Sequence, residues 1–126
     1  MSELRVLIVD DEGELAYTLA ERLVLRGFAA EGATSGEAAL DRIEEAEFDV
    51  VVMDVRMPGI GGLTAIERIG ELRPGLPVIL VTGHGCRESA EEGLRLGAYR
   101  YLMKPVHIDD LAEYIRQAAG ASGGTP

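Results

Sequence analysis

Short runs of apolar residues alternate along the chain with segments whose apolar residues recur at helical spacing. The runs are rich in β-branched residues and are continuous rather than alternating, which is typical of strands buried on both faces of a sheet. Strands are predicted over residues 4–9, 28–33, 48–53, 76–81 and 98–103. The last is weaker, and the second, which is the least apolar, is expected at a sheet edge.

The intervening segments predict five helices. Gly27 is expected to end the first, and the Thr-Ser-Gly-Glu sequence of residues 34–37 has the form of a capping box, so the second should begin near Ser35. Asp109 is the expected N-cap of a fifth helix over residues 110–119. The apolar positions that define the helices are Leu15, Leu19, Leu23 and Val24; Ala39, Leu40 and Ile43; Leu63, Ile66, Ile69 and Leu72, closed by Pro74 and Gly75; Ala90 and Leu94, followed by Gly97; and Leu111, Ile115 and Ala118.

The alternation of strands and helices predicts an α/β fold with a doubly wound parallel sheet, because each parallel crossover needs a helix to return the chain. A chain of 126 residues with 47% hydrophobic composition can build one well-buried core. One domain is therefore expected over residues 1–119. The small residues of 120–126 are expected to form a flexible tail or a truncated linker.

Charge and hydropathy exclude several functions. The chain has 12 basic and 22 acidic residues and a net charge of −10, so its surface should repel nucleic-acid phosphates, and direct nucleic-acid binding is not expected. No apolar run approaches the roughly 20 residues that cross a bilayer, and the first residues do not form a secretory signal. The lone Cys86 cannot form an internal disulfide. A cytoplasmic protein without a membrane partner is expected.

Polar residues follow four of the predicted strands. Asp10 and Asp11 come after the first strand, Asp54 after the third, Thr82 after the fourth and Lys104 after the fifth. In an open α/β sheet, ligands bind outside the carboxyl ends of the strands, so these side chains should meet there. Each alone could be a helix cap, a turn residue or a solvated side chain. That explanation does not account for their meeting at one edge.

Three converging carboxylates repel one another, and a bound cation is the simplest way to neutralise them. All-oxygen ligands with room for water favour Mg²⁺, with Asp11 and Asp54 as direct ligands. With such shielding, the Asp54 carboxylate can attack a phosphoryl group. Lys104 would then supply a positive charge, and the Thr82 hydroxyl a hydrogen bond, to the phosphoryl oxygens.

Four motifs resemble those of the response-regulator receiver domains of two-component signal transduction, the CheY-like superfamily. The resemblance extends over about residues 4–119 and implies a flavodoxin-like sheet with strand order 2-1-3-4-5. The motifs are Val-Asp10-Asp11-Glu12, Met-Asp54-Val-Arg-Met-Pro58-Gly59, Val-Thr82-Gly83 and Tyr101-Leu-Met-Lys104-Pro105. Any one of them is weak, but the ordered set is specific.

This resemblance implies a signalling domain without a turnover substrate, in which Asp54 receives its phosphoryl group from a sensor histidine kinase or a histidine phosphotransfer protein. It implies that Asp11 and Asp54 bind Mg²⁺ directly, that Asp10 does so through water, and that the backbone carbonyl of Arg56 completes the protein ligands. Mn²⁺ would substitute for Mg²⁺. The peptide bond before Pro105 is expected to be cis.

The resemblance also implies a conformational switch. The Thr82 hydroxyl would move toward the phosphoryl group, and Tyr101 would turn inward. The face made by the fourth helix, the fifth strand and the fifth helix would then change for an effector domain or a second copy. From the residues alone, Tyr101 is a half-buried strand tyrosine. Arg56 and His84 occupy positions expected to tune the lifetime of the acyl phosphate, although His84 could equally be a solvent-exposed loop histidine.

Two other functions remain open. The chain could be a pseudo-receiver that signals by protein contact without phosphorylation, although the complete set of polar residues argues against this. It could also be a phosphatase that uses an aspartyl phosphate, but such enzymes usually carry a second aspartate where this chain has Arg56. Gly61 and Gly62 occur where many relatives have an acidic residue before glycine, and a more mobile loop is expected there.

Overall fold

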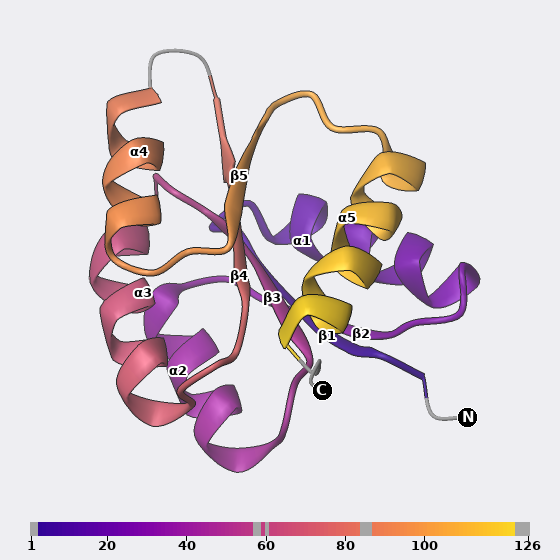
Figure 1. Cartoon of the computed structure of the whole chain (residues 1–126). Coiled ribbons are helices and arrows are strands. Elements are labelled where there is room, and N and C mark those ends of the chain that lie inside the picture. The colour runs from indigo at the N-terminus through magenta and orange to yellow at the C-terminus, as the bar shows by residue number, and fades with distance from the viewer. Residues whose placement is uncertain (1–2, 57–58, 60, 84–86, 123–126) are drawn as a thin grey trace.

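A computed structural model describes residues 3–56, 59, 61–83 and 87–122 of the chain. Its centre is a five-stranded parallel sheet with the order β2-β1-β3-β4-β5, as Figure 1 shows, so the predicted doubly wound fold and strand order are confirmed. β2 lies at a sheet edge, as its weak apolar character predicts. The strands are β1 (Arg5–Val9), β2 (Ala29–Ala33), β3 (Val50–Asp54), β4 (Val78–Thr82) and β5 (Arg100–Met103).

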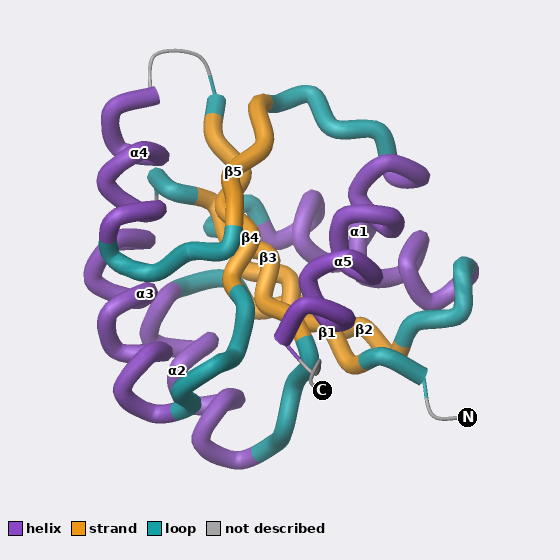
Figure 2. Tube along the Cα trace, in the orientation of Figure 1, coloured by secondary structure: helices purple, strands orange, loops and turns teal. Residues whose placement is uncertain are grey.

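Helices cover both faces of this sheet, with α1 and α5 on one face and α2, α3 and α4 on the other (Figures 1 and 2). They are α1 (Gly13–Leu25), α2 (Gly36–Glu45), α3 (Gly61–Leu72), α4 (Arg87–Arg95) and α5 (Ile108–Ser122). Gly27 follows α1 with a φ of 95°, a left-handed conformation that glycine adopts without strain, and it ends this helix as predicted. No helix among the described residues is long and apolar enough to span a bilayer.

Two hydrophobic layers separate the sheet from its helices. Alternate residues of a strand point to opposite faces, so Val6 and Ile8 of β1 pack toward α1 and α5, while Leu7 and Val9 pack toward α2 and α3. All four are almost completely buried. Burial on both faces explains why the strand sequences are continuous apolar runs.

Strand register brings the polar residues to one edge. Val9 pairs with Met53, so Asp10 lies beside the end of β3, where Asp54 pairs with Val81. Thr82 pairs in turn with Met103, one residue before Lys104. The carboxyl ends of β1, β3, β4 and β5 therefore lie beside one another at one edge of the sheet.

The start of α2 differs in one detail from the predicted capping box. Ser35 is the N-cap, and its hydroxyl accepts a hydrogen bond of 3.0 Å from the Ala38 amide. Thr34 is therefore not the capping residue. The Glu37 carboxylate lies instead against Gly59 in the loop after β3, where an added Cβ would come within 2.8 Å of it.

The predicted bounds of the last helix are wrong at both ends. α5 begins at Ile108, so Asp109 lies in its first turn rather than at its N-cap. The Asp109 carboxylate accepts a hydrogen bond of 2.8 Å from Arg26 Nε at the end of α1, a contact distant in sequence. The helix also continues to Ser122 and takes in the first three residues of the predicted tail. Residues 123–126 lie outside the described residues.

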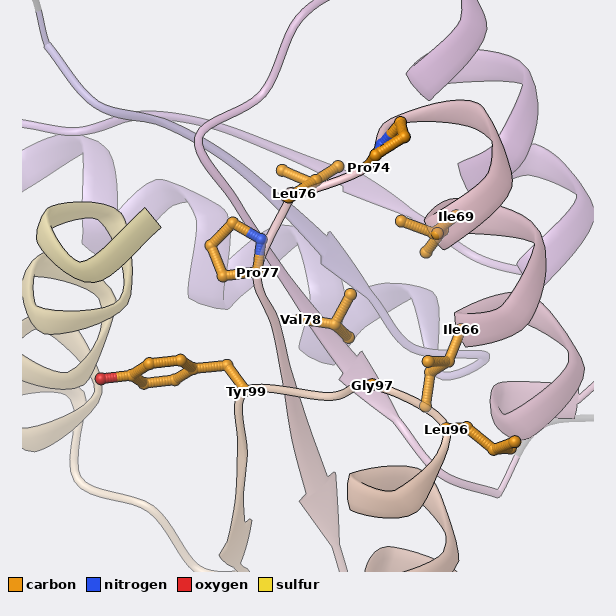
Figure 3. Close-up of a pocket in the computed structure, with 11 residues that line it drawn as sticks. Ile66, Ile69, Pro74, Leu76, Pro77, Val78, Leu96, Gly97 and Tyr99 are labelled. Atoms are coloured by element: carbon orange, nitrogen blue, oxygen red, sulfur yellow. The ribbon is translucent and has the colours of Figure 1, made fainter. Parts of the chain in front are cut away.

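An apolar cavity of about 300 Å³ lies at the amino ends of the strands, opposite the edge that carries the polar residues. It is beside the first residue of β4 (Figure 3). Ile66 and Ile69 of α3, together with Leu96, supply much of its wall. Tyr99 is its single titratable lining residue, and its ring points away from the other labelled side chains. The other residues that line the cavity carry no titratable group.

Candidate functional site

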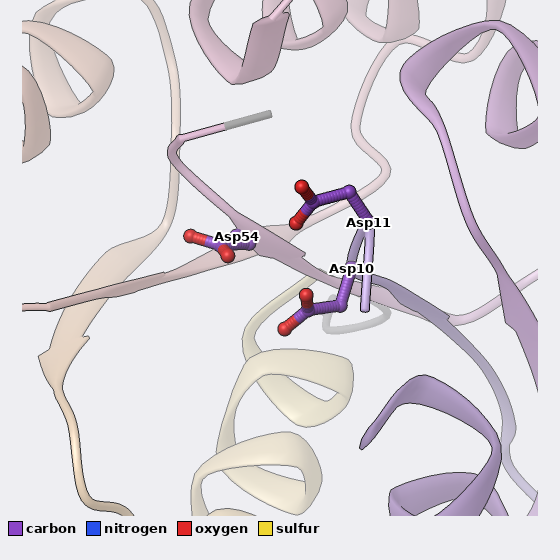
Figure 4. Close-up of side chains that lie close together, drawn as sticks. All are labelled: Asp10, Asp11 and Asp54. Carbon is purple, nitrogen blue, oxygen red and sulfur yellow. The ribbon is translucent and has the colours of Figure 1, made fainter. Parts of the chain in front are cut away.

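Three carboxylates meet at the carboxyl edge of the sheet, and each offers an oxygen within 4.8 Å of the others (Figure 4). Asp54 is the last residue of β3, and Asp10 and Asp11 directly follow β1. Asp10 and Asp54 are only 4% and 9% exposed, whereas Asp11 is exposed. Two nearly buried anions so close together need compensation from positive charge or hydrogen bonds.

Backbone amides provide part of that compensation. The Glu12 amide donates to Asp10 Oδ1 over 2.9 Å, and the Arg56 amide donates to Asp54 Oδ1 over 3.1 Å. Each carboxylate is thus oriented by the amide two residues later. Burial raises the pKa of Asp10, and this effect, with the charges of Asp54 and Asp11, outweighs the Glu12 hydrogen bond and the attraction of Lys104.

Lys104 supplies a cation to this cluster from the end of β5. Its ammonium lies 3.4 Å from Asp54 Oδ2 and 3.6 Å from Asp10 Oδ2. Burial acts to lower the pKa of Lys104, but the charges of Asp54 and Asp10 outweigh burial and raise it. The Lys104 amide donates to the Thr82 carbonyl over 2.8 Å, which fixes its backbone beside β4, and its peptide bond to Pro105 is cis.

Thr82 and Tyr101 lie on the same face of the sheet. Thr82 is fully buried, and its hydroxyl donates to the Gly83 carbonyl over 3.2 Å. Tyr101 pairs with Leu80, two residues before Thr82 along β4, and is half-buried against the layer on the α2 and α3 side. The hydroxyl proton therefore already has an acceptor, which it would leave in order to donate to any other group.

The residues present fit a magnesium ion. The cluster contains only oxygen donors, which a hard cation prefers, and its carboxylates are close enough to share one ion. Lys104 alone leaves the three carboxylates with excess negative charge. Magnesium binding is therefore compatible with both the donors and the electrostatics of this site.

The described residues place most, but not all, of the predicted site. His84 lies outside them. Arg56 is exposed, and its amide contacts Asp54. Sequence interpretation missed the Glu12 amide, because a backbone donor carries no signal of residue type. The greater loop mobility expected at Gly61 and Gly62 stays a prediction. Sequence interpretation also missed how closely Gly62 approaches the backbone after β3, where an added Cβ would lie 2.8 Å from the Val55 carbonyl oxygen.

Comparisons with known proteins agree with this geometry. Residues 6–116 match the response regulator receiver domain family. The regulatory protein AtoC of Escherichia coli is 38% identical over 114 residues, which cover 90% of this chain and 25% of AtoC. A CheY-like receiver domain protein from Methanospirillum hungatei superimposes with a TM-score of 0.90 at 33% identity, covering 96% of this chain and 97% of that one. NtrX from Brucella abortus gives a TM-score of 0.88 at 31% identity, covering 94% of this chain and 27% of NtrX.

The sheet order, with an acidic cluster and a lysine at its carboxyl edge, defines a signalling domain of the receiver class. The chain belongs to the family of response regulator receiver domains, found in two-component regulators. It spans about a quarter of the length of the first curated relatives it matches.

Proposed function

We propose that this domain is a phosphorylation-dependent switch in which Asp54 accepts a phosphoryl group from a phosphohistidine. The observation that carries the proposal is the position of the Lys104 ammonium, 3.4 Å from Asp54 Oδ2 and 3.6 Å from Asp10 Oδ2. A cation beside a carboxylate at an open edge of the sheet can shield the approach of a second anion.

Each polar residue has one role in this reaction. An oxygen of the Asp54 carboxylate attacks phosphorus, a P–O bond forms, and the P–N bond of the donor breaks with its electron pair returning to the imidazole. The Arg56 amide holds Asp54 in orientation during the attack. Lys104 stabilises charge on the transferred group, and the Thr82 hydroxyl exchanges the Gly83 carbonyl for a phosphoryl oxygen.

Asp11 and Asp54 would bind Mg²⁺ directly, Asp10 through water, and the Arg56 backbone carbonyl would complete the protein ligands. Bound Mg²⁺, or Mn²⁺ in its place, would neutralise negative charge on the carboxylates and the phosphoryl oxygens. The side chains of Arg56 and His84 are proposed to tune the lifetime of the acyl phosphate by controlling the approach of water.

The proposed output is a change of the face formed by α4, β5 and α5. Leu94, Tyr99 and Met103 are 38%, 39% and 44% exposed there, which leaves apolar area for a partner. Movement of the Thr82 hydroxyl would free space for Tyr101 on the same face of the sheet. An effector domain or a second copy of the chain would distinguish the two surfaces.

The partners follow from this reaction. We propose that the donor is a sensor histidine kinase or a histidine phosphotransfer protein in the cytoplasm. We propose that the receiver unit consists of residues 1–119 together with the last residues of α5, which continues to Ser122. The relatives are about four times as long as the matched segment, which supports an effector domain in the whole protein. The net charge of −10 argues against contact of this segment with DNA.

The test is intact-mass measurement after incubation with Mg²⁺ and acetyl phosphate. We expect a gain of one phosphoryl group that is lost in Asp54→Asn and retained in Asp41→Asn, an exposed control on α2. No gain with acetyl phosphate or any kinase would refute the proposal and favour the pseudo-receiver. Sustained release of phosphate from monoesters would favour the phosphatase, and the position of Arg56 argues against that outcome.

A further inference from the structure

Gly62, near the start of α3, lies unusually close to the end of β3. A Cβ at this position would lie 2.8 Å from the Val55 carbonyl oxygen, 2.9 Å from the Asp54 carbonyl oxygen and 3.0 Å from Val55 Cα. All three atoms belong to the backbone, which cannot swing away as a flexible side chain would. The glycine is therefore needed for this close approach.

The same approach includes a hydrogen bond. The Gly62 amide donates to the Val55 carbonyl over 3.3 Å. Amides in the first turn of a helix have no partner within the helix, so this bond satisfies one of them. On its other side, Val55 is fixed to the sheet, since its amide donates to the Val81 carbonyl over 3.1 Å.

The peptide group that joins Val55 to Arg56 connects this contact to the phosphoacceptor. Its carbonyl accepts from Gly62, and its N–H donates to Asp54 Oδ1 over 3.1 Å. A peptide group is planar, so the two ends move together. Displacing the Val55 carbonyl must rotate or shift the Arg56 N–H relative to the Asp54 carboxylate.

We propose that Gly62 is a positioning residue for the reaction at Asp54, acting through the Val55–Arg56 peptide group. Its missing side chain lets α3 begin against β3, and the resulting contact aims the Arg56 N–H at the Asp54 carboxylate. An added methyl group would push the Val55 carbonyl away by roughly half an ångström, to reach ordinary van der Waals contact. This inference rests on the proposed phosphorylation of Asp54.

Gly70 provides a matched control on the same helix. It is exposed, and a Cβ there would meet no atom within 4 Å. Gly70→Ala is expected to raise the melting temperature by about 2–5 °C, because alanine favours a helix interior, and to leave phosphorylation unchanged. The double variant Gly62→Ala, Gly70→Ala should recover part or all of any stability lost at Gly62.

The experiment compares wild type, both single variants and the double variant with acetyl phosphate at saturating Mg²⁺. Gly62→Ala should slow phosphorylation of Asp54 by about 10-fold or more, because small misplacements of a reacting group are costly. The defect should persist in the double variant at a recovered melting temperature. The Arg56 amide proton should move upfield in NMR spectra of Gly62→Ala, but not of Gly70→Ala, because it loses its carboxylate acceptor.

Phosphorylation of the double variant within twofold of wild type, or an unmoved Arg56 resonance, would overturn the proposal and leave Gly62 a packing residue. If Gly62→Ala does not fold, hydrogen exchange of the wild-type Gly62 amide decides: protection supports the contact, and exchange at the rate of an unstructured amide refutes it. If wild type gains no phosphoryl group at all, the proposed function fails, and this inference fails with it.

Discussion

Replacing Asp10 by asparagine should make the domain more stable when Mg²⁺ is removed. The substitution keeps the shape of the side chain, and the amide oxygen can still accept the 2.9 Å hydrogen bond from the Glu12 amide. What it removes is one negative charge from a nearly buried position, 4% exposed, beside two other carboxylates. The electrostatic change is thus separated from packing.

The expected gain follows from the distances. Two unit charges separated by the 4.8 Å limit of the cluster repel by about 3.5 kcal/mol at an effective dielectric constant of about 20. Asp10 has two such neighbours, Asp54 and Asp11, and one attraction of comparable size from Lys104 at 3.6 Å. Solvent weakens the repulsion between Asp10 and Asp11, because Asp11 is exposed. Asp10→Asn should therefore stabilise the domain by about 1–2 kcal/mol, or roughly 3–10 °C in melting temperature.

The assay is urea and thermal denaturation in a chelating buffer, with Asp41→Asn as the control. Asp41 is exposed on α2, so its replacement makes the net charge less negative by the same amount, away from the cluster. Lower stability of Asp10→Asn than of wild type would refute the argument. Equal stabilisation by Asp41→Asn would assign the effect to net charge instead.

Mg²⁺ should reverse part of this difference. A ligand at a hundred times its dissociation constant adds about 2.7 kcal/mol to the free energy of unfolding. Wild type should show a gain of this kind, and Asp10→Asn a smaller one at the same concentration. Equal gains in the two proteins would show that the Asp10 carboxylate does not contribute to Mg²⁺ binding.

Two further predictions concern stability alone. Ser35→Ala removes the acceptor of the 3.0 Å bond from the Ala38 amide and should cost about 1 kcal/mol in urea denaturation; no loss would show that the cap is dispensable. The Glu31 carboxylate accepts from Arg42 Nε over 2.6 Å, and this bond lowers the pKa of Glu31 below its usual 4.5. A lowered carboxyl pKa contributes stability above pH 4.5 that is lost as the pH falls through the lowered value, so Glu31→Gln should cost up to about 1 kcal/mol at pH 7. The difference in stability between wild type and Glu31→Gln should become smaller in acid. A difference independent of pH would contradict stabilisation by the ionised Glu31 carboxylate.

The sequence predicted the sheet well because its strands are buried on both faces. Their apolar runs match the five strands to within two residues at each end. It also predicted that Asp54 and Lys104 meet although they are 50 residues apart, because parallel strands end at a common edge. The rule concerns backbone topology, so it needed no knowledge of side-chain contacts.

Helix ends were predicted less well because neighbouring residues compete for the same role. Thr34 and Ser35 both have hydroxyls suited to an N-cap, and backbone geometry selects Ser35. Asp109 has the right chemistry for a cap, but it pairs with Arg26, which lies 83 residues away in the sequence. The role of Gly62 was not predicted for a similar reason. Its contact with the Val55 carbonyl exists only once α3 has packed against β3.

The repulsion among the carboxylates of the site and its proposed switching both depend on how Lys104 is shared. Lys104 is shared between Asp10 and Asp54, so it cannot fully neutralise either. A group that brings positive charge would neutralise the two carboxylates more fully. A group with new oxygens would draw Lys104 and the buried Thr82 hydroxyl toward itself and leave the carboxylates less neutralised. Thr82 pairs with Met103, two residues beyond Tyr101 on β5. In the proposed switch, a change at Asp54 would therefore reach an exposed face through the adjacent strands β4 and β5.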